Sequence, residues 1–381
     1  MKIAVPKEIV PGERRVALTP DAAAALIKGG FEVIVETGAG EGAFHSDGAY
    51  EKAGARIAPD AATLYGQADV VMKVQKPSLS EVDPLRSGTV LVSFLSALTS
   101  PELVQRLAAR RITSFGMEGV PRISRAQKMD AMSSQANIAG YKAVLLAAES
   151  LAKVFPMMMT AAGTVFAARV LVIGAGVAGL QAIATAHRLG AQVWGYDVRA
   201  AVKEQIESLG AKFLELDLGI ADAEDRGGYA KALSPDASRR QQEMLAEKTK
   251  DFDVVVTTAL VPGRPAPRLI TQETVAGMRP GSVIVDLAAE AGGNCELTVI
   301  DEVVVRHGVT IHGPTNLPAT MPVDASQLYA RNVTELLREF VKDGALAIDF
   351  DDEVIKGACV THGGEIVNEA VKRAWAAGQT A

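Results

Sequence analysis

The stretch that decides the fold runs from residue 168 to residue 200, ARVLVIGAGVAGLQAIATAHRLGAQVWGYDVRA. Its first apolar run predicts a buried strand, and a glycine-rich turn follows directly. A helix that ends at Gly190 and a second strand that ends at Asp197 complete the pattern. Strand, turn, helix and strand in this order predict one βαβ unit, whose two strands lie parallel in a sheet.

Three glycines in the turn follow the spacing G-x-G-x-x-G, which indicates a dinucleotide site when a strand precedes it and a helix follows. Gly174 allows the tight turn, Gly176 lets the backbone approach a pyrophosphate, and Gly179 lets helix and strand pack closely. The start of the helix offers backbone N–H groups to the phosphates. We therefore expect a dinucleotide site, the structural alternative being a glycine-rich turn that binds nothing.

Asp197 follows the turn by about twenty residues and can accept hydrogen bonds from both hydroxyls of the adenosine ribose. Its charge would repel a 2′-phosphate, which favours NAD(H) over NADP(H). Arg199 argues the other way, because an arginine at this position could bind such a phosphate. The sequence predicts NAD(H) as the cofactor.

Strand and helix patterns alternate on both sides of this unit, which is typical of parallel sheets with helical crossovers. Two of the helical segments are long. The first covers residues 129–153, and the second covers residues 324–343, with Asp324 as the expected N-cap and Gly344 as the expected stop. Both are expected to connect domains.

A chain of 381 residues exceeds the roughly 250 to 300 residues at which single cores stop growing. The tail, residues 345–366, has alternating strand character and is expected to return to the first domain. We therefore expect an α/β protein of two Rossmann-like domains with parallel sheets, linked by two long helices. The expected domains are a discontinuous N-terminal α/β domain (residues 1–135 plus 325–381) and an NAD-binding Rossmann domain (residues 136–324).

Charge and composition exclude several classes of function. The net charge is −6 and no basic stripe occurs, so a nucleic-acid partner is not expected. Cys295 and Cys359 are the only cysteines, which argues for a reducing compartment and against a disulfide framework or a cysteine metal site. No metal is expected. Early charges and prolines argue against a signal peptide, and no stretch is long and apolar enough for direct membrane insertion.

A polar cluster stands out in an otherwise apolar chain, RISRAQKMDAMSSQANIAGY at residues 122–141. The side chains of this cluster offer fixed hydrogen-bond donors and acceptors, but no His, Cys or Glu. A nicotinamide enzyme that oxidises an alcohol or amine usually needs a general acid or base, and none of the five histidines lies in a suggestive context. The cluster could be a ligand site, or only the polar cap of the helix that follows, with Asp130 and Ser124 as capping residues.

Several stretches together resemble one family. They are VPKEIVPGERRVALTP, ETGAGEGA, PRISRAQKMD, SSQANIAGY, FPMMMTAAGTV, VLVIGAGVAGLQAIATA, DVRAA, GGYAK, TTALVPGRPAP and DLAAEAGGNCE. This set, which covers essentially the whole chain, is similar to the NAD(H)-binding component (subunit α1, or domain I) of proton-translocating NAD(P) transhydrogenase. Alanine dehydrogenases are relatives of that component and share its fold.

Two positions separate these two groups of proteins. Alanine dehydrogenases resemble KVKEP and FLH, where a lysine and a histidine bind substrate and transfer protons; this chain has KVQKP and FLS, with Gln75 and Ser96 there. Arg15, which would hold a substrate carboxylate in the dehydrogenases, is interpreted as structural here. The resemblance therefore favours a transhydrogenase. The alternatives are an alanine-dehydrogenase-like amino-acid dehydrogenase and a regulatory module that senses NAD.

The resemblance implies direct hydride transfer between NADH and NADP⁺ held on a partner component, coupled to proton translocation by a membrane component. It also implies a homodimer and a cytoplasmic location at the inner face of the cell membrane. Arg122, Gln127, Asp130 and Ser133 would orient the nicotinamide. The cofactor-binding residues would be Arg122, Ile123, Ser124, Arg125, Gln127, Asp130, Ser133, Gly174, Gly176, Val177, Gly179, Asp197, Val198, Arg199, Gly228, Tyr229, Gln241, Ala259 and Leu260.

The segment at residues 222–251 contains Gly228 and Tyr229 and matches the mobile loop that closes over nucleotide in this family. A plain exposed linker leading into a helix is the alternative. The chain departs from the family at two places. Phe166 and Ala167 replace a pair of prolines, and residues 213–226 differ in length and charge from the expected pattern.

Overall fold

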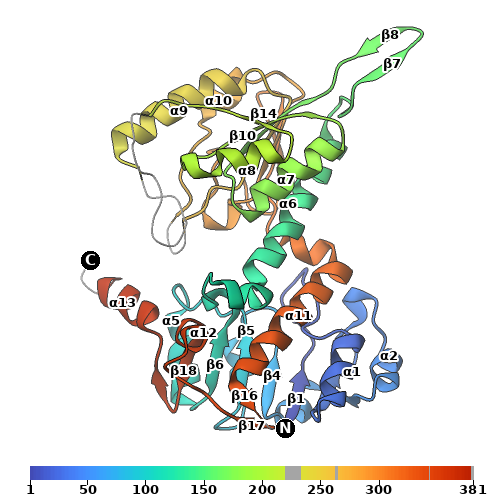
Figure 1. Cartoon of the computed structure of the whole chain (residues 1–381), viewed down its shortest axis with the longest axis vertical. Coiled ribbons are helices and arrows are strands. Elements are labelled where there is room, and N and C mark those ends of the chain that lie inside the picture. The colour runs from blue at the N-terminus through green and yellow to red at the C-terminus, as the bar shows by residue number, and fades with distance from the viewer. Residues whose placement is uncertain (219–232, 262–264, 343, 379–381) are drawn as a thin grey trace. The chain divides into compact units, whose positions relative to one another are not determined.

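The computed structural model describes residues 1–218, 233–261, 265–342 and 344–378 (Figure 1). The chain forms two compact units. Unit 1 contains Met1–Gln135 and Pro318–Ala381, and unit 2 contains Ala136–Leu317. The chain thus enters unit 2 once and returns once. No helix among the described residues is long and apolar enough to cross a membrane.

Unit 1 is built on an eight-stranded sheet in the order β19-β18-β6-β5-β4-β1-β2-β3. Its strands are β1 (Lys2–Val5), β2 (Glu32–Glu36), β3 (Arg56–Ala58), β4 (Val70–Met72), β5 (Val90–Ser93), β6 (Thr113–Gly116), β18 (Cys359–His362) and β19 (Glu365–Ile366). The six strands nearest the N-terminus in sequence pair in parallel, and β18 joins β6 antiparallel. The tail therefore completes the sheet that the N-terminus begins.

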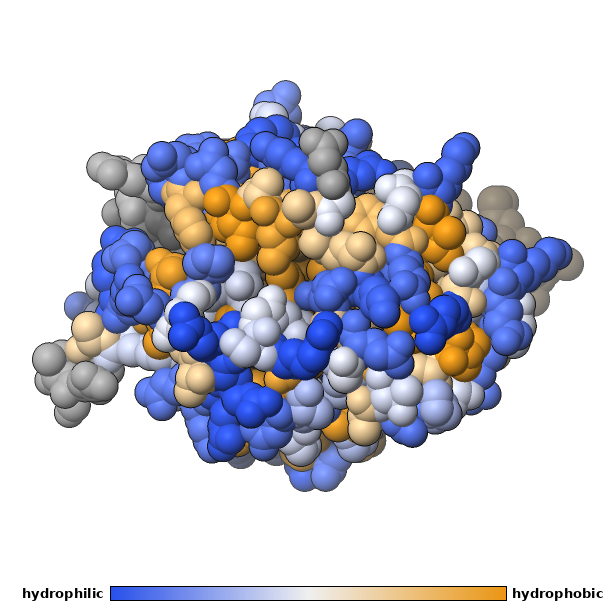
Figure 2. All heavy atoms as spheres, turned by 90° about the horizontal axis from the view of Figure 1, so that it is seen from below, coloured by the Kyte–Doolittle hydropathy of each residue, from blue (hydrophilic) through white to orange (hydrophobic). Residues whose placement is uncertain are grey.

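Both faces of this sheet are covered, as a parallel sheet requires. Side chains alternate along each strand, so Ile3 and Val5 belong to one buried cluster while Ala4 belongs to the other. The covering elements are α1 (Pro20–Lys28), α2 (Asp47–Lys52), α3 (Ala61–Tyr65), α4 (Leu79–Val82), α5 (Pro101–Ala109), α11 (Pro322–Phe340), α12 (Glu353–Ala358) and α13 (Glu369–Gly378). Figure 2 shows hydrophilic residues over most of one face of the molecule, with apolar residues in a band between them.

Unit 2 is built on a seven-stranded sheet in the order β11-β10-β9-β12-β13-β15-β14. Its strands are β9 (Arg169–Ile173), β10 (Gln192–Tyr196), β11 (Lys212–Phe213), β12 (Val254–Thr257), β13 (Val283–Asp286), β14 (Val303–Arg306) and β15 (Val309–His312). All neighbours pair in parallel except the edge strand β14. The chain moves from β9 to one side first and then to the other, so the strand order reverses between β9 and β12. Open α/β sheets bind ligands at such a point.

The helices of unit 2 are α7 (Val177–Arg188), α8 (Lys203–Ser208), α9 (Pro235–Thr249) and α10 (Gln272–Gly277). A separate hairpin, β7 (Met158–Thr160) and β8 (Gly163–Val165), extends away from the unit 2 sheet (Figure 1). Every residue of its two strands is exposed. The expected long helix at residues 129–153 is confirmed as α6 (Ala131–Ser150), which begins in unit 1 and continues into unit 2.

The second long helix differs at both ends from the prediction. Helix α11 begins at Pro322, because proline already has the backbone angle of a first helical turn, so Asp324 lies inside that turn and does not cap it. The helix ends at Phe340 and not at Gly344, because the chain becomes extended at Val341 and pairs as β16 (Val341–Lys342) with β17 (Ala345–Leu346).

The tail also contains a helix where the sequence predicted only strands. Asp352 caps α12: its Oδ1 accepts hydrogen bonds from the N–H groups of Val354 at 2.8 Å and Ile355 at 3.3 Å. Aspartate is among the preferred N-cap residues, so this signal was present in the sequence and was missed.

Candidate nucleotide-binding site

Three neighbouring strands of unit 2 bring the predicted site residues together. The glycine-rich turn follows β9, Asp197 follows β10, and Ala259 with Leu260 follows β12. These strands are adjacent and parallel, so their carboxyl ends meet at one edge of the sheet. The edge coincides with the reversal of strand order.

The glycines of the turn have the geometry that their predicted tasks require. Gly174 has a φ of +99°, which side chains rarely allow. A Cβ added to Gly179 would lie 1.8 Å from the carbonyl oxygen of Gly174, so any side chain there would collide with the turn. A Cβ on Gly176 would meet no atom within 4 Å. The backbone at Gly176 is therefore open to a ligand.

Helix α7 starts at this open position. Gly176 is its N-cap residue and supplies no capping side chain. The N–H groups of the first turn and the positive end of the helix dipole together attract anions, above all phosphate. A second helix crosses here: a Cβ on Gly140 of α6 would lie 2.1 Å from the carbonyl oxygen of Ala178, so a glycine permits this contact.

Asp197 is nearly buried and accepts hydrogen bonds from two backbone groups and one side chain. The N–H of Ala175 donates to Oδ2 at 2.8 Å, and the N–H of Arg199 donates to Oδ1 at 2.9 Å. The guanidinium of Arg199 donates from Nε to Oδ1 at 2.9 Å and from Nη2 to Oδ2 at 2.8 Å. Burial by itself raises the pKa of Asp197, but the hydrogen bonds from Arg199 and Ala175 outweigh it and lower this pKa below its usual range.

The loop after β12 is held by a residue that sequence reasoning did not single out. Asn294 is completely buried, and its side-chain amide bonds both sides of one residue of the loop. Its Oδ1 accepts from the N–H of Ala259 at 3.0 Å, and its Nδ2 donates to the carbonyls of Ala259 at 2.9 Å and Pro267 at 2.8 Å. Leu260, the next residue, is 48% exposed. The pattern GGNCE contains Asn294, but nothing in its spacing indicates this partner.

Gln241 lies in α9 and is also buried. Its Nε2 donates to the hydroxyl of Tyr196 at 2.9 Å, so it fastens α9 to the end of β10. Burial raises the pKa of Tyr196 to about 12, which keeps the hydroxyl protonated. The predicted helix at the end of segment 222–251 is thus present, while Gly228 and Tyr229 lie outside the described residues.

In unit 1, the polar cluster precedes α6 and forms a short 3₁₀ helix, η3 (Ser124–Met129). Asp130 then caps α6: its Oδ1 accepts from the N–H of Ser133 at 2.8 Å, and its Oδ2 accepts from the hydroxyl of Ser133 at 2.6 Å. The capping contact named as the alternative interpretation therefore exists. Ser124, in contrast, makes no cap, because the N-cap residue of η3 is Ile123 and no side chain bonds there.

The other members of the cluster differ in what they contact. Arg125 pairs with Glu339 and Asp352, two carboxylates of unit 1, and this pairing lowers the pKa of Asp352. Gln127 is exposed, and its side chain forms no hydrogen bond with any described residue. Arg122 is exposed as well. Gln127 therefore has its carboxamide available to a ligand, whereas the charge of Arg125 is already balanced.

Unit 1 also contains the positions that distinguish an amino-acid dehydrogenase. Arg15 is 4% exposed, and its Nε and Nη2 donate to Glu13 at 2.9 and 2.6 Å. Its Nη1 donates to Gln135 at 2.8 Å, and Nε2 of Gln75 donates to Glu13 at 2.8 Å. The interpretation of Arg15 as structural agrees with these contacts, because internal partners occupy its guanidinium.

Ser96 has a left-handed backbone, with a φ of +50°. The carboxylate of Glu118 holds it there by accepting from the N–H groups on either side, Leu95 at 3.0 Å and Ala97 at 3.1 Å. A short hydroxyl stands where a dehydrogenase would carry a catalytic imidazole.

The described residues contain no group of three or more His, Cys, Asp or Glu side chains that could hold a metal ion. Cys295 and Cys359 are buried free thiols. Burial raises the pKa of Cys295 to about 11 and that of Cys359 to about 12, so both thiols stay protonated.

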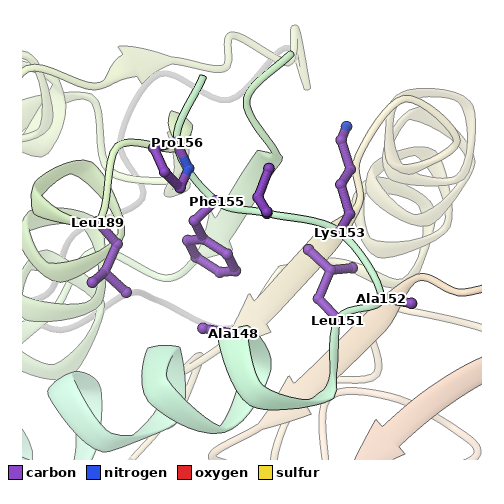
Figure 3. A pocket seen from close by; sticks show the side chains of 8 residues that line it. Ala148, Leu151, Ala152, Lys153, Phe155, Pro156 and Leu189 are labelled. Carbon is purple, nitrogen blue, oxygen red and sulfur yellow. The ribbon is translucent and has the colours of Figure 1, made fainter. Parts of the chain in front are cut away.

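An apolar depression in unit 2 lies apart from the glycine-rich turn (Figure 3). Lys153 on its rim bonds Asp253, which also accepts from the N–H of Arg169, so the depression borders the starts of the strands and not their carboxyl ends. Its lining residues are Ala148, Leu151, Ala152, Lys153, Val154, Phe155, Pro156 and Leu189.

Comparison with known proteins gives the same picture across the whole chain. Residues 4–139 match the family model "Alanine dehydrogenase/PNT, N-terminal domain", and residues 143–369 match "Alanine dehydrogenase/PNT, C-terminal domain". An NAD(P) transhydrogenase subunit alpha protein of Rhodospirillum rubrum is 53% identical over 379 residues, covering 97% of this chain and 99% of that protein. Alanine dehydrogenase of Bacillus subtilis is 32% identical over 382 residues, covering 98% and 94%.

A solved structure agrees with the fold as well as the sequence. The crystal structure of transhydrogenase from Sinorhizobium meliloti superposes with a TM-score of 0.85 at 44% identity, covering 97% of this chain and 100% of that chain. The predicted two-domain α/β fold and the predicted resemblance are confirmed. The chain belongs to the alanine dehydrogenase/PNT family, and its relatives include transhydrogenase alpha subunits that are more similar to it than the alanine dehydrogenase of Bacillus subtilis is.

Proposed function

We propose that this chain is the NAD(H)-binding subunit of a proton-translocating NAD(P) transhydrogenase. Its cofactor is NAD(H), and its role is that of an oxidoreductase subunit. Hydride would pass directly between NADH on this chain and NADP⁺ on a partner component, and a membrane component would couple the transfer to proton movement. The supporting relatives are named as transhydrogenase alpha subunits.

The observation that carries the proposal is the closed ion pair at Arg15. A dehydrogenase that oxidises an amino acid needs a cation for the substrate carboxylate and a base for the proton. Here Glu13 and Gln135 occupy the guanidinium of Arg15, and Gln75 and Ser96 cannot act as the base. The dinucleotide site, in contrast, has all its expected elements.

Hydride transfer between two nicotinamides requires geometry and no proton transfer at the reacting carbons. Holding two reactants in a near-attack geometry can by itself supply several orders of magnitude in rate. Among the cluster residues, we assign the direct contact with the nicotinamide carboxamide to Gln127, whose side chain is exposed and makes no hydrogen bond with the described residues of the chain. Asp130 and Ser133 would fix the turn that carries Gln127, and Arg122 would complete the set.

The adenosine end would bind in unit 2. Asp197 would accept from the ribose hydroxyls, and the glycine-rich turn with the first turn of α7 would hold the pyrophosphate. Leu260, already exposed on a loop that Asn294 holds, would cover one side of the nucleotide. Val177, Val198, Ala259, Gln241, Gly228 and Tyr229 belong to this site by family resemblance.

The proposed partners are a membrane-spanning component and an NADP(H)-binding component, which would place this chain at the cytoplasmic face of the membrane. A homodimer is also proposed, and the hairpin β7–β8 supports it. Met157, Met159 and Phe166 on this hairpin are 59%, 79% and 71% exposed. Apolar side chains gathered in this way usually mark a protein interface.

The proposal is tested by mixing the purified chain with a purified NADP(H)-binding component. Stopped-flow spectroscopy with an NADH analogue as donor should show hydride transfer to the NADP-site nucleotide. In parallel, the chain alone should not reduce NAD⁺ with L-alanine. Steady turnover with alanine, or with pyruvate and ammonia, would instead establish the amino-acid dehydrogenase.

A further inference from the structure

The carboxylate of Asp197 has no vacant acceptor position. Its two oxygens can accept about four hydrogen bonds. Arg199 fills both positions on Oδ1, from its backbone N–H and from Nε, each at 2.9 Å. Ala175 N–H and Nη2 of Arg199 fill those on Oδ2, both at 2.8 Å. A ribose with two hydroxyls cannot bond this carboxylate until two donors leave.

The four donors are not equally replaceable. The N–H groups of Ala175 and Arg199 belong to the backbone of the glycine-rich turn and of the strand end, so they stay in place. The guanidinium is a side chain that can rotate away. Its ion pair with Asp197 is largely screened from water, with the side chains of Asp197 and Arg199 only 6% and 13% exposed. The ribose must therefore displace the guanidinium of Arg199.

We propose that Arg199 determines nucleotide specificity as an internal competitor: its guanidinium occupies the ribose position on Asp197, and Asp197 in turn keeps that guanidinium from binding a 2′-phosphate. The inference rests on the proposed ribose contact of Asp197. Arginine binds phosphate through paired N–H donors, the same donors that Asp197 engages here. NADPH is then excluded twice, by the charge of Asp197 and by the capture of Arg199.

The competition has a cost and a benefit for NAD(H) binding. Displacing an ion pair weakens NADH binding, because some of the contact energy replaces an interaction that already exists. The same pair stops the cation from recruiting NADPH, which a subunit dedicated to NAD(H) must not bind. Removing either partner should therefore have opposite effects on the two nucleotides.

Three variants test the proposal by fluorescence titration with NADH and with NADPH. Arg199→Met removes the competitor and should tighten NADH binding by about 3- to 10-fold, as expected for loss of a partly screened ion pair, with NADPH binding still weak. Asp197→Asn should weaken NADH binding and tighten NADPH binding by roughly 10-fold or more. In the double variant the gain in NADPH affinity should disappear, because the phosphate then has no guanidinium to bind.

A matched control removes a nearby charge outside the pair. Lys203 is exposed and pairs with Glu215, so Lys203→Met should change neither dissociation constant by more than about twofold, the effect of a surface pair. Thermal unfolding of each variant identifies any that fail to fold, and Asp197→Ser then replaces Asp197→Asn.

Two results would overturn the inference while the proposed function stands: weaker NADH binding by Arg199→Met, or a gain in NADPH affinity that persists in the double variant. Failure of the unaltered chain to bind NADH at all would overturn the proposed function itself. The titrations thus distinguish the two claims.

Discussion

Replacing Gln127 with asparagine should slow hydride transfer about ten- to a hundred-fold while leaving folding and NADH binding nearly unchanged. The substitution draws the carboxamide back by one C–C bond, about 1.5 Å. A displacement of about 1 Å at a reacting centre can cost a factor of about a hundred. The expected loss corresponds to about 1.4 to 2.7 kcal/mol of transition-state stabilisation.

Stability should not change, because the side chain of Gln127 is exposed and bonds no described residue. Exposed substitutions of this kind usually stay within about 0.5 kcal/mol. NADH affinity should hold because the proposed ribose and phosphate contacts lie in unit 2. Asp130→Asn should behave similarly to Gln127→Asn, since an asparagine Oδ1 can still accept from the N–H of Ser133 and so preserve the cap.

The assay is single-turnover stopped flow with a saturating NADH analogue and a purified NADP(H)-binding component, from about pH 6 to about pH 9, a range in which carboxylates stay ionised. Lys128→Gln is the control, because Lys128 is exposed and adjacent but has no proposed role. The variants should show lower rates with an unchanged pH dependence. Weak binding with a normal rate at saturation would reduce the cluster to an affinity element. No change in either quantity would leave it as a helix cap alone.

Three further predictions follow from the geometry. Gly179→Ala should abolish NADH binding and destabilise the fold by about 2 kcal/mol or more, seen in titration and thermal unfolding, because its Cβ would lie 1.8 Å from a backbone oxygen of Gly174. Gly140→Ala should lower the melting temperature by a cost of about 1 to 3 kcal/mol, through a 2.1 Å contact with the carbonyl of Ala178; an unchanged melting curve would contradict this packing. NADH affinity should stay flat as pH falls from about 8 to about 5, because the lowered pKa of Asp197 keeps the carboxylate ionised there; a loss centred near about pH 6 would point to a histidine.

The sequence predicted the elements of the fold that depend on local pattern. Helix α1 has the expected Thr19 cap, Pro20 at its first position and Gly29 at its end. The glycine-rich turn was readable because each glycine answers a local steric demand, as the positive φ of Gly174 illustrates. The start of α11 was misjudged for a related reason: Asp324 and Pro322 are both signals for a helix start, and the proline decides.

The contacts that complete the site could not be read in the same way. Asn294 bonds Ala259 from 35 residues away, and no spacing rule connects them. The ion pair between Asp197 and Arg199 involves residues only two apart, yet its existence depends on the rotamer of the arginine. The sequence showed which chemical groups are present, and the structure shows which of them already bind each other.

The clamp that Asn294 places on Ala259 has a consequence for the thermodynamics of binding. The N–H and the carbonyl of one residue are both bonded to a completely buried amide, so the loop backbone is ordered when the chain folds. A flexible loop would lose that conformational freedom only when nucleotide arrives, and binding would be weaker by the corresponding entropy. NADH thus meets Ala259 and Leu260 already in place, and the entropic cost of arranging them belongs to the folding of the protein.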